Sequence, residues 1–268
     1  MPEIHERPPI ASAPLSVILF ANALDTETQE GLHRWRGYLA TLGREHEIVL
    51  LQETRPEVSP ADTGESSLRT ITYERTTGIR DALNEAIRSA RHPLVVFCPC
   101  DLQYQPIDLE RMVKVIDKVD LVTGYRGGGH APPWRVMLDL LLGILSRLML
   151  GIALEPRACW LGGDGWGRRW TARWVFGVRV LDPECPFRLA RRAVFEHLPF
   201  QSGGPFVQVE MLAKANHLGC YLAEEPVSWT PPALPAATAI SFAQDAGRVF
   251  RDPDFGRYGD PAALSPAG

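Results

Sequence analysis

The chain has 268 residues, 45% of them hydrophobic, so it can bury one sizeable core in a single α/β domain or two small ones. Its formal net charge of −4 argues against a nucleic-acid-binding protein. Its five cysteines, an odd number without a paired framework, indicate a reducing compartment, and the polar, proline-rich N-terminus does not resemble a signal peptide.

The first half of the chain alternates predicted strands and helices. Residues 1–13 are expected to form a flexible arm. Apolar, β-branched runs predict strands at residues 15–21, 47–51, 69–73, 93–98 and 120–124. Helical spacing predicts helices at residues 26–42, 78–90 and 106–118, the first stopped by Gly43 and the third opened by Pro106. This alternation predicts βα units and a mostly parallel sheet.

The second half has a different composition. Residues 135–151 are predicted to form an apolar helix, but Asp139 and Arg147 inside it argue against a free transmembrane helix. Residues 157–192 carry eight arginines and three acidic residues, and several tryptophans lie among them. Tryptophan with arginine suits a membrane interface or a phosphate-bearing lipid. The alternative is that Trp170 and Trp174, four residues apart, pack one helix face onto the core.

The last part of the chain is predicted to contain a helix at residues 205–218 and a strand at residues 220–227. Residues 231–268, rich in Pro and Ala, are expected to be a loose tail. The sequence thus predicts one domain over residues 14–230, with halves of different composition at 14–126 and 127–230.

Ligands of a parallel α/β sheet bind at the carboxyl ends of its strands. Three such ends are Phe20-Ala21-Asn22, Gln52-Glu53 and Pro99-Cys100-Asp101. We expect these ends to converge on one crevice that is large enough for a nucleotide.

The order of these pieces resembles family 2 glycosyltransferases, especially dolichol- or polyprenyl-phosphate sugar synthases, over about residues 14–230. The strongest match is VVFCPCDLQYQP at residues 95–106, similar to the family strand that ends in Asp-x-Asp-Leu-Gln before a proline. Shorter matches are DLVTGYR at 120–126, Arg135, VLDPECPFRLARR at 180–192, FVQVE at 206–210 and EPV at 225–227.

The resemblance implies a GT-A-type nucleotide-sugar-binding fold, with a mostly parallel mixed sheet flanked by helices. It makes residues 14–126 the nucleotide-binding half and residues 127–230 the acceptor-binding half. It implies a hexosyltransferase that moves a sugar from a nucleotide-diphosphate donor to a polyprenyl phosphate or related acceptor. The implied donor-binding residues are Ala21, Asn22, Gln52, Glu53, Asp101 and Gln103. Asp101 and Gln103 would also hold Mg²⁺ or Mn²⁺, a hard cation that offsets the charge of the leaving diphosphate.

The resemblance assigns acceptor binding to Arg126, Arg135 and Arg188, because guanidinium groups bind phosphate through paired hydrogen bonds. Asp101 and Asp182 are the catalytic candidates, Asp182 as general base if the acceptor is a hydroxyl. Simpler roles remain open. Asp101 can be a turn or helix cap, Arg126 and Arg135 can be surface salt-bridge residues, and Asp182 can shape a turn.

The sequence departs from the family pattern at three carboxylate positions. The first strand runs into residues 20–24, FANAL, the second ends in Gln52-Glu53, and Pro99 replaces the first aspartate of Asp-x-Asp. These changes motivate an alternative, a non-catalytic GT-A-fold protein that binds a glycan, a lipid head group or a partner. A nucleotidyltransferase ranks below both, because residues 21–28 lack a glycine-rich basic loop. The expected partners are a nucleotide sugar and a lipid phosphate, so we expect a cytoplasmic protein, peripheral on the inner face of the membrane.

Overall fold

The computed structural model describes residues 9–21, 25–54, 68–74, 78–126, 177, 180–195, 198–204, 206–230 and 239–254. The predicted helix at 135–151 and the tryptophan-rich stretch up to residue 176 lie outside this set. Among the described helices, none combines the length and hydropathy that crossing a bilayer requires.

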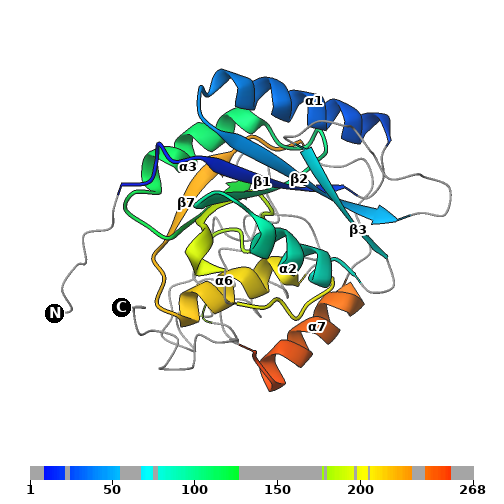
Figure 1. Ribbon diagram of the computed structural model, residues 1–268. Coiled ribbons are helices and arrows are strands. Elements are labelled where there is room, and N and C mark those ends of the chain that lie inside the picture. Colours follow the sequence, from blue (N-terminus) through cyan, green and yellow to red (C-terminus); the bar gives the residue numbers. More distant parts are fainter. Residues whose placement is uncertain are drawn as a thin grey trace, which may run out of the picture.

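A seven-stranded sheet forms the centre of the fold (Figure 1), in the order β3-β2-β1-β4-β6-β5-β7. Its strands are β1 (Leu15–Ala21), β2 (His46–Thr54), β3 (Leu68–Glu74), β4 (Leu94–Pro99), β5 (Leu121–Arg126), β6 (Arg188–Arg191) and β7 (Leu222–Val227). Strand β6 runs antiparallel to both neighbours, β4 and β5, and the other pairs are parallel. The sheet is therefore mixed and mostly parallel, which confirms the predicted fold class.

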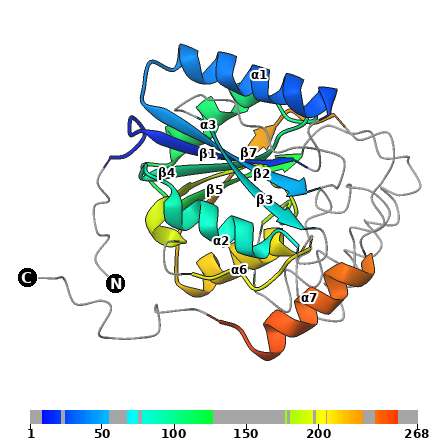
Figure 2. The same ribbon diagram turned by 45° about the vertical axis from the view of Figure 1, so that its right-hand side comes forward.

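Helices cover both faces of the sheet. They are α1 (Thr26–Thr41), α2 (Arg80–Ser89), α3 (Leu109–Val115), α6 (Val207–His217) and α7 (Ala239–Arg251), with short 3₁₀ turns at Pro106–Asp108 and Arg192–Val194. Figures 1 and 2 show α1 and α3 on one face, with α2 and α6 on the other. The predicted helices and strands of residues 15–124 and 205–227 are thus present, with ends that differ by a few residues.

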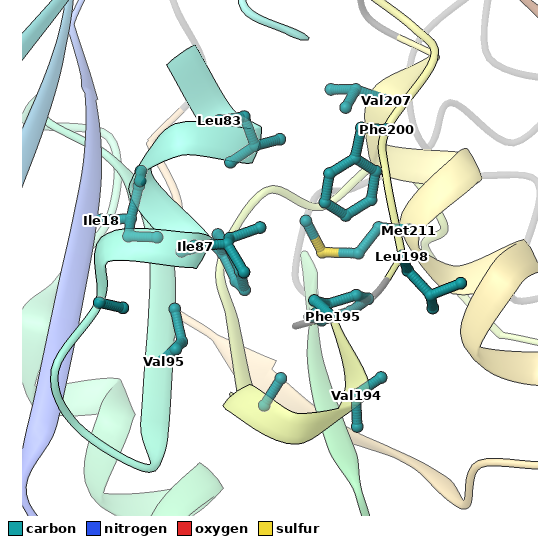
Figure 3. Close-up of a cluster of buried hydrophobic side chains, with 14 of the residues drawn as sticks. Ile18, Leu83, Ile87, Val95, Val194, Phe195, Leu198, Phe200, Val207 and Met211 are labelled. Carbon is teal, nitrogen blue, oxygen red and sulfur yellow. The ribbon is translucent and has the colours of Figure 1, made fainter. Parts of the chain in front are cut away.

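The core lies in two layers because β1, β2 and β4 are buried on both faces. Ile18 and Val95 point toward α2 and α6, where they meet Leu83, Ile87 and Met211 (Figure 3). The neighbouring strand residues point to the opposite layer, under α1 and α3. Strands buried on both faces have continuous apolar runs, which is why the sequence identified them.

The sequence analysis did not predict a strand at β6. Its four residues, RLAR, have no apolar run and therefore no strand signal of their own. Pairing with β4 and β5 makes them a strand, with Val96 and Val122 both opposite Leu189. Because β6 is antiparallel, its first residue lies at the edge of the sheet where the parallel strands end. The turn that carries Asp182 is thereby brought to that edge.

Both terminal predictions differ from the structure. Part of the expected flexible arm is docked, because the backbone N–H groups of Ile10 and Ala11 donate to Oδ1 of Asp117, at 2.6 and 2.8 Å. Part of the expected loose tail is helix α7, which packs against α6 through the contacts of Val249 with Phe206 and Val209. Neither segment has a long apolar run, so its docking depends on partners distant in sequence.

Candidate functional site

The carboxyl ends of β1, β2 and β4 meet at one edge of the sheet. Ala21 lies opposite Gln52, and Phe20 lies opposite Pro99. The N–H of Cys100 donates to the carbonyl oxygen of Phe20 at 2.7 Å, which continues the pairing one residue beyond β4. Four of the predicted donor-binding residues, Ala21, Gln52, Glu53 and Asp101, are on these strand ends or directly after them. Asn22 lies outside the described residues.

Gln52 has an unusual side chain for a buried strand. The residue is only 1% exposed, and no described residue forms a hydrogen bond with its side-chain oxygen Oε1. A buried acceptor that is left unpaired costs about 1–3 kcal/mol, so such groups in native proteins need an explanation. The next residue, Glu53, points to the other face of the sheet and lies beside Tyr73. Burial, and after it the charge of Glu53, raises the pKa of Tyr73 to about 12.

Asp101 follows β4 and is held by a local turn. Its Oδ1 accepts a hydrogen bond from the backbone N–H of Gln103 at 3.0 Å. Helix α1 packs closely on this loop, because a Cβ atom at Gly31 would lie 2.9 Å from the carbonyl oxygen of Cys100. Burial raises the pKa of Asp101 to about 6. The carboxyl group is therefore positioned by the fold and still ionised at neutral pH.

The donor set around Asp101 fits a cation that shares its coordination with a ligand. In the described ranges, no group of three or more His, Cys, Asp or Glu residues is close enough together to hold a metal ion. Magnesium ions usually keep several waters and bind one or two carboxylates plus the phosphates of a substrate. Asp101, with Gln103 two residues later, meets that requirement when a diphosphate is present. Pro99 offers no side-chain ligand.

A second cluster lies at the carboxyl end of β5. Nε and Nη2 of Arg126 donate to the two carboxylate oxygens of Asp182, at 2.6 and 2.9 Å. The side chain of Asp182 is 2% exposed and that of Arg126 is 18% exposed. Burial by itself lowers the pKa of Arg126, but the hydrogen bonds to Asp182 raise it above its usual range. Two residues predicted to act separately on the acceptor are thus one buried ion pair.

Trp229 connects this ion pair to the loop after β4. The guanidinium carbon of Arg126 lies 5.2 Å from the centre of the Trp229 ring, a cation–π geometry. Trp229 forms an antiparallel bridge with Tyr104, and the N–H of Thr230 donates to the carbonyl oxygen of Gln103 at 3.0 Å. Sequence reasoning did not select Trp229. The available signal was an aromatic residue just after the last strand, and that signal is weak alone.

The buried position of Arg188 does not match the role in acceptor binding that the resemblance implied. The residue is completely buried. Its guanidinium donates to Oγ1 of Thr123 at 3.3 Å, to the carbonyl oxygen of Gln208 at 2.6 Å and to that of Pro183 at 2.8 Å. These bonds tie β5, the first turn of α6 and the turn that carries Asp182 to the start of β6. Burial lowers the pKa of Arg188 to about 10, so it is charged at neutral pH. Arg135 lies outside the described residues.

Residues 52–149 match the sequence model of glycosyl transferase family 2. The matched segment includes Gln52, Asp101 and Arg126, so both clusters have members within it. The match agrees with the predicted family and with the predicted transferase class.

Solved structures of glucosyl-3-phosphoglycerate synthase from Mycobacterium tuberculosis have a similar fold. One is 18% identical, covers 90% of this chain and 81% of the other, and has a TM-score of 0.58. A complex with Mn²⁺, UDP-glucose and phosphoglyceric acid is 17% identical, covers 88% and 81%, and has a TM-score of 0.55. A complex with Mn²⁺, UDP-glucose and glycerol 3-phosphate is 18% identical, covers 91% and 82%, and has a TM-score of 0.59. At these identities the likeness shows the shared GT-A fold.

Proposed function

We propose that this family 2 chain transfers a sugar from a nucleotide-diphosphate donor to an acceptor that carries a phosphate group. The observation that carries the proposal is the unpaired, buried Oε1 of Gln52 at the edge where β1, β2 and β4 end. A nucleobase has N–H groups that can donate to this oxygen, and Asp101 lies at the same edge for the diphosphate. The structural neighbours bind UDP-glucose, which supports a donor of this kind.

The two ends of the donor, its base and its diphosphate, would bind to different residues. Gln52 would read the base, with Ala21, Asn22 and Glu53 as the other predicted contacts near it. Asp101 and Gln103 would hold Mg²⁺ or Mn²⁺ together with the diphosphate, as the neighbours' complexes with Mn²⁺ suggest. The cation supplies Lewis-acid stabilisation of the leaving diphosphate.

Two independent observations support an acceptor that carries a phosphate group. The sequence resembles polyprenyl-phosphate sugar synthases, and the structural neighbours bind phosphoglyceric acid or glycerol 3-phosphate. In our proposal Arg126, with Arg135, receives this phosphate. Asp182 shares both oxygens with Arg126, so it would chiefly orient that guanidinium. A phosphate oxygen that attacks the sugar is already ionised and needs no strong general base.

Nucleotide binding to the full chain tests the donor site. We would titrate UDP and GDP, with Mn²⁺, by calorimetry. Gln52→Ala should weaken the preferred nucleotide about three- to tenfold, the value of one hydrogen bond. Gln29→Ala is the matched control, because Gln29 is exposed on α1. Failure of every nucleotide to bind would contradict the proposal.

Turnover separates the transferase from a non-catalytic binding protein. Radiolabelled donor sugar should move to a polyprenyl phosphate or to phosphoglyceric acid, and the product identifies the acceptor. Nucleotide binding without transfer to either acceptor would favour the alternative that the altered carboxylates suggest. Salt-sensitive pelleting with anionic liposomes would support a lipid acceptor and a peripheral membrane location.

A further inference from the structure

The indole N–H of Trp229 is a buried donor. Nε1 of this residue is shielded from solvent, and no acceptor for it is present in the part of the chain that the structure describes. Most buried N–H groups in native proteins are paired, and an unpaired one costs free energy. This donor lies on the ring that stacks against Arg126, so it is adjacent to the proposed acceptor site.

Arg126 has donor capacity left beside that ring. Its backbone N–H, Nε and Nη2 donate to Asp182 at 3.3, 2.6 and 2.9 Å, and the described residues supply no acceptor for Nη1. A guanidinium has five N–H donors in a fixed fork. The two side chains in this contact therefore each have a donor for which the described residues supply no acceptor: Nη1 of Arg126, which is cationic, and Nε1 of Trp229, which is neutral.

The charge of the cluster favours an anion. Arg188 is completely buried, and its three hydrogen-bond acceptors are a hydroxyl and two carbonyl oxygens. Both carboxylate oxygens of Asp182 accept hydrogen bonds from Arg126 instead. Arg126 and Arg188 thus carry two positive charges beside the one carboxylate of Asp182. An anion nearby would stabilise this net positive charge, because charges interact strongly in a low-dielectric interior.

We propose that Trp229 determines acceptor specificity, with its indole N–H and Nη1 of Arg126 binding the same oxyanion of the acceptor, a phosphate or carboxylate oxygen. This inference rests on the proposed function and adds to it a residue that the sequence analysis did not select. Because Nε1 is shielded from solvent, binding requires a local opening beside Trp229. Asp182 keeps its bonds to Arg126 and holds the guanidinium over the ring.

Trp229→Phe isolates the N–H from the other contributions of this residue. Phenylalanine keeps an aromatic ring for Arg126, and the backbone contacts with Tyr104 and Gln103 do not depend on the side chain. A purely structural role for Trp229 would therefore be largely preserved in this variant.

The test follows the indole resonances of the uniformly ¹⁵N-labelled full chain, which has seven tryptophans. The resonance missing in Trp229→Phe belongs to Trp229. Inorganic phosphate, added with saturating nucleotide so that the donor site is filled, should shift that resonance saturably. Trp229→Phe should bind phosphate about tenfold more weakly, with unchanged nucleotide affinity and Tm. Arg111→Gln is the control, because Arg111 is exposed and contacts the nearby Pro226 carbonyl.

Two further titrations, with phosphoglyceric acid and with farnesyl phosphate, distinguish a soluble acid from a lipid phosphate as the source of the anion. A shift of the Trp229 resonance by any of the three probes supports the inference. If nucleotide binds but none of the probes shifts this resonance, or if Trp229→Phe binds them as tightly as the natural chain, the inference is wrong and the proposed donor site survives. If nucleotide and probes all fail to bind, both proposals fall.

Discussion

At the residue scale, burial of Asp101 disfavours the ionised carboxylate that a bound cation would require. Burial raises the pKa of this carboxyl group to about 6, so the folded chain holds its proton more tightly than the unfolded chain does. Stability therefore falls as the pH rises from about 4 to about 6, because Asp101 ionises more readily in the unfolded chain, and protonation at lower pH restores it. Such a cost is typical of a group kept for binding rather than for stability.

Asp101→Asn should therefore stabilise the chain at pH 7.5, by about 1–2 kcal/mol after allowing for partial solvent screening. The amide can still accept the N–H of Gln103, and the buried charge is gone. The gain should disappear near pH 4, where Asp101 of the natural chain is protonated in the folded state. Thermal unfolding across this pH range measures it.

Asp81→Asn serves as the contrast for that experiment. Asp81 is exposed, and its hydrogen bond with Arg80 lowers its pKa. Its replacement should give no gain at pH 7.5. A Tm for Asp101→Asn that falls at pH 7.5, or rises equally at pH 4, would show that burial of the charge is not what Asp101 contributes.

At the element scale, helix α6 contains a buried ion pair whose two side chains also bind the segment before the helix. Glu210 and Lys214 are one helical turn apart, 2.8 Å from each other, with side chains 0% and 2% exposed. Glu210 also accepts the backbone N–H groups of Gln201 and Ser202, at 2.8 and 2.9 Å. The carboxylate therefore fixes the loop before α6. Glu210 ends the segment FVQVE that resembles the family, and these contacts give it a structural role in this chain.

Glu210→Gln should destabilise the chain by roughly 3 kcal/mol, because it leaves Lys214 buried without a counter-charge. Urea denaturation gives the free energy of unfolding. The exposed Glu85→Gln on α2 should change it by less than about 0.5 kcal/mol. Nucleotide affinity of the folded variant should be unchanged. Equal stability of Glu210→Gln and the natural chain would argue against this account of α6.

At the scale of the whole molecule, α7 covers a part of α6 that the sheet does not reach. Ala246 and Val249 pack on Phe206 and Val209, and Asp245 accepts the N–H of Gly204 at 3.0 Å. The helix thus returns the C-terminal part of the chain to the loop before α6.

Removal of residues 239–268 should lower the free energy of unfolding by about 2 kcal/mol or more, because it exposes Phe206 and Val209. Calorimetric unfolding measures the change, and removal of residues 255–268 alone is the control. Nucleotide affinity should stay the same, since the proposed donor site is at the ends of β1, β2 and β4. A truncated chain as stable as the full one would mean that α7 is not part of the folded unit.

The sequence predicted most elements because their signals are local. Apolar runs identified β1, β2, β4 and β5, and the end of β4 led to the prediction that Asp101 is a site residue. Strand β6 was missed because its sequence is polar and its pairing depends on distant strands. Helix α7 was missed because it follows a proline-rich stretch, although its own residues have an amphipathic helical pattern.

The sequence alone therefore determined the class of fold, the resemblance to family 2 glycosyltransferases and the strand ends that meet at one edge of the sheet, because burial and periodicity leave a pattern within each segment. Only the tertiary structure decided that Arg126 pairs with Asp182, 56 positions away, that Arg188 is a core residue, and that Trp229 stacks on Arg126. Those contacts depend on the antiparallel insertion of β6 and on the path of the chain after β7. Such long-range geometry arises from how the elements pack together, and no single segment encodes it.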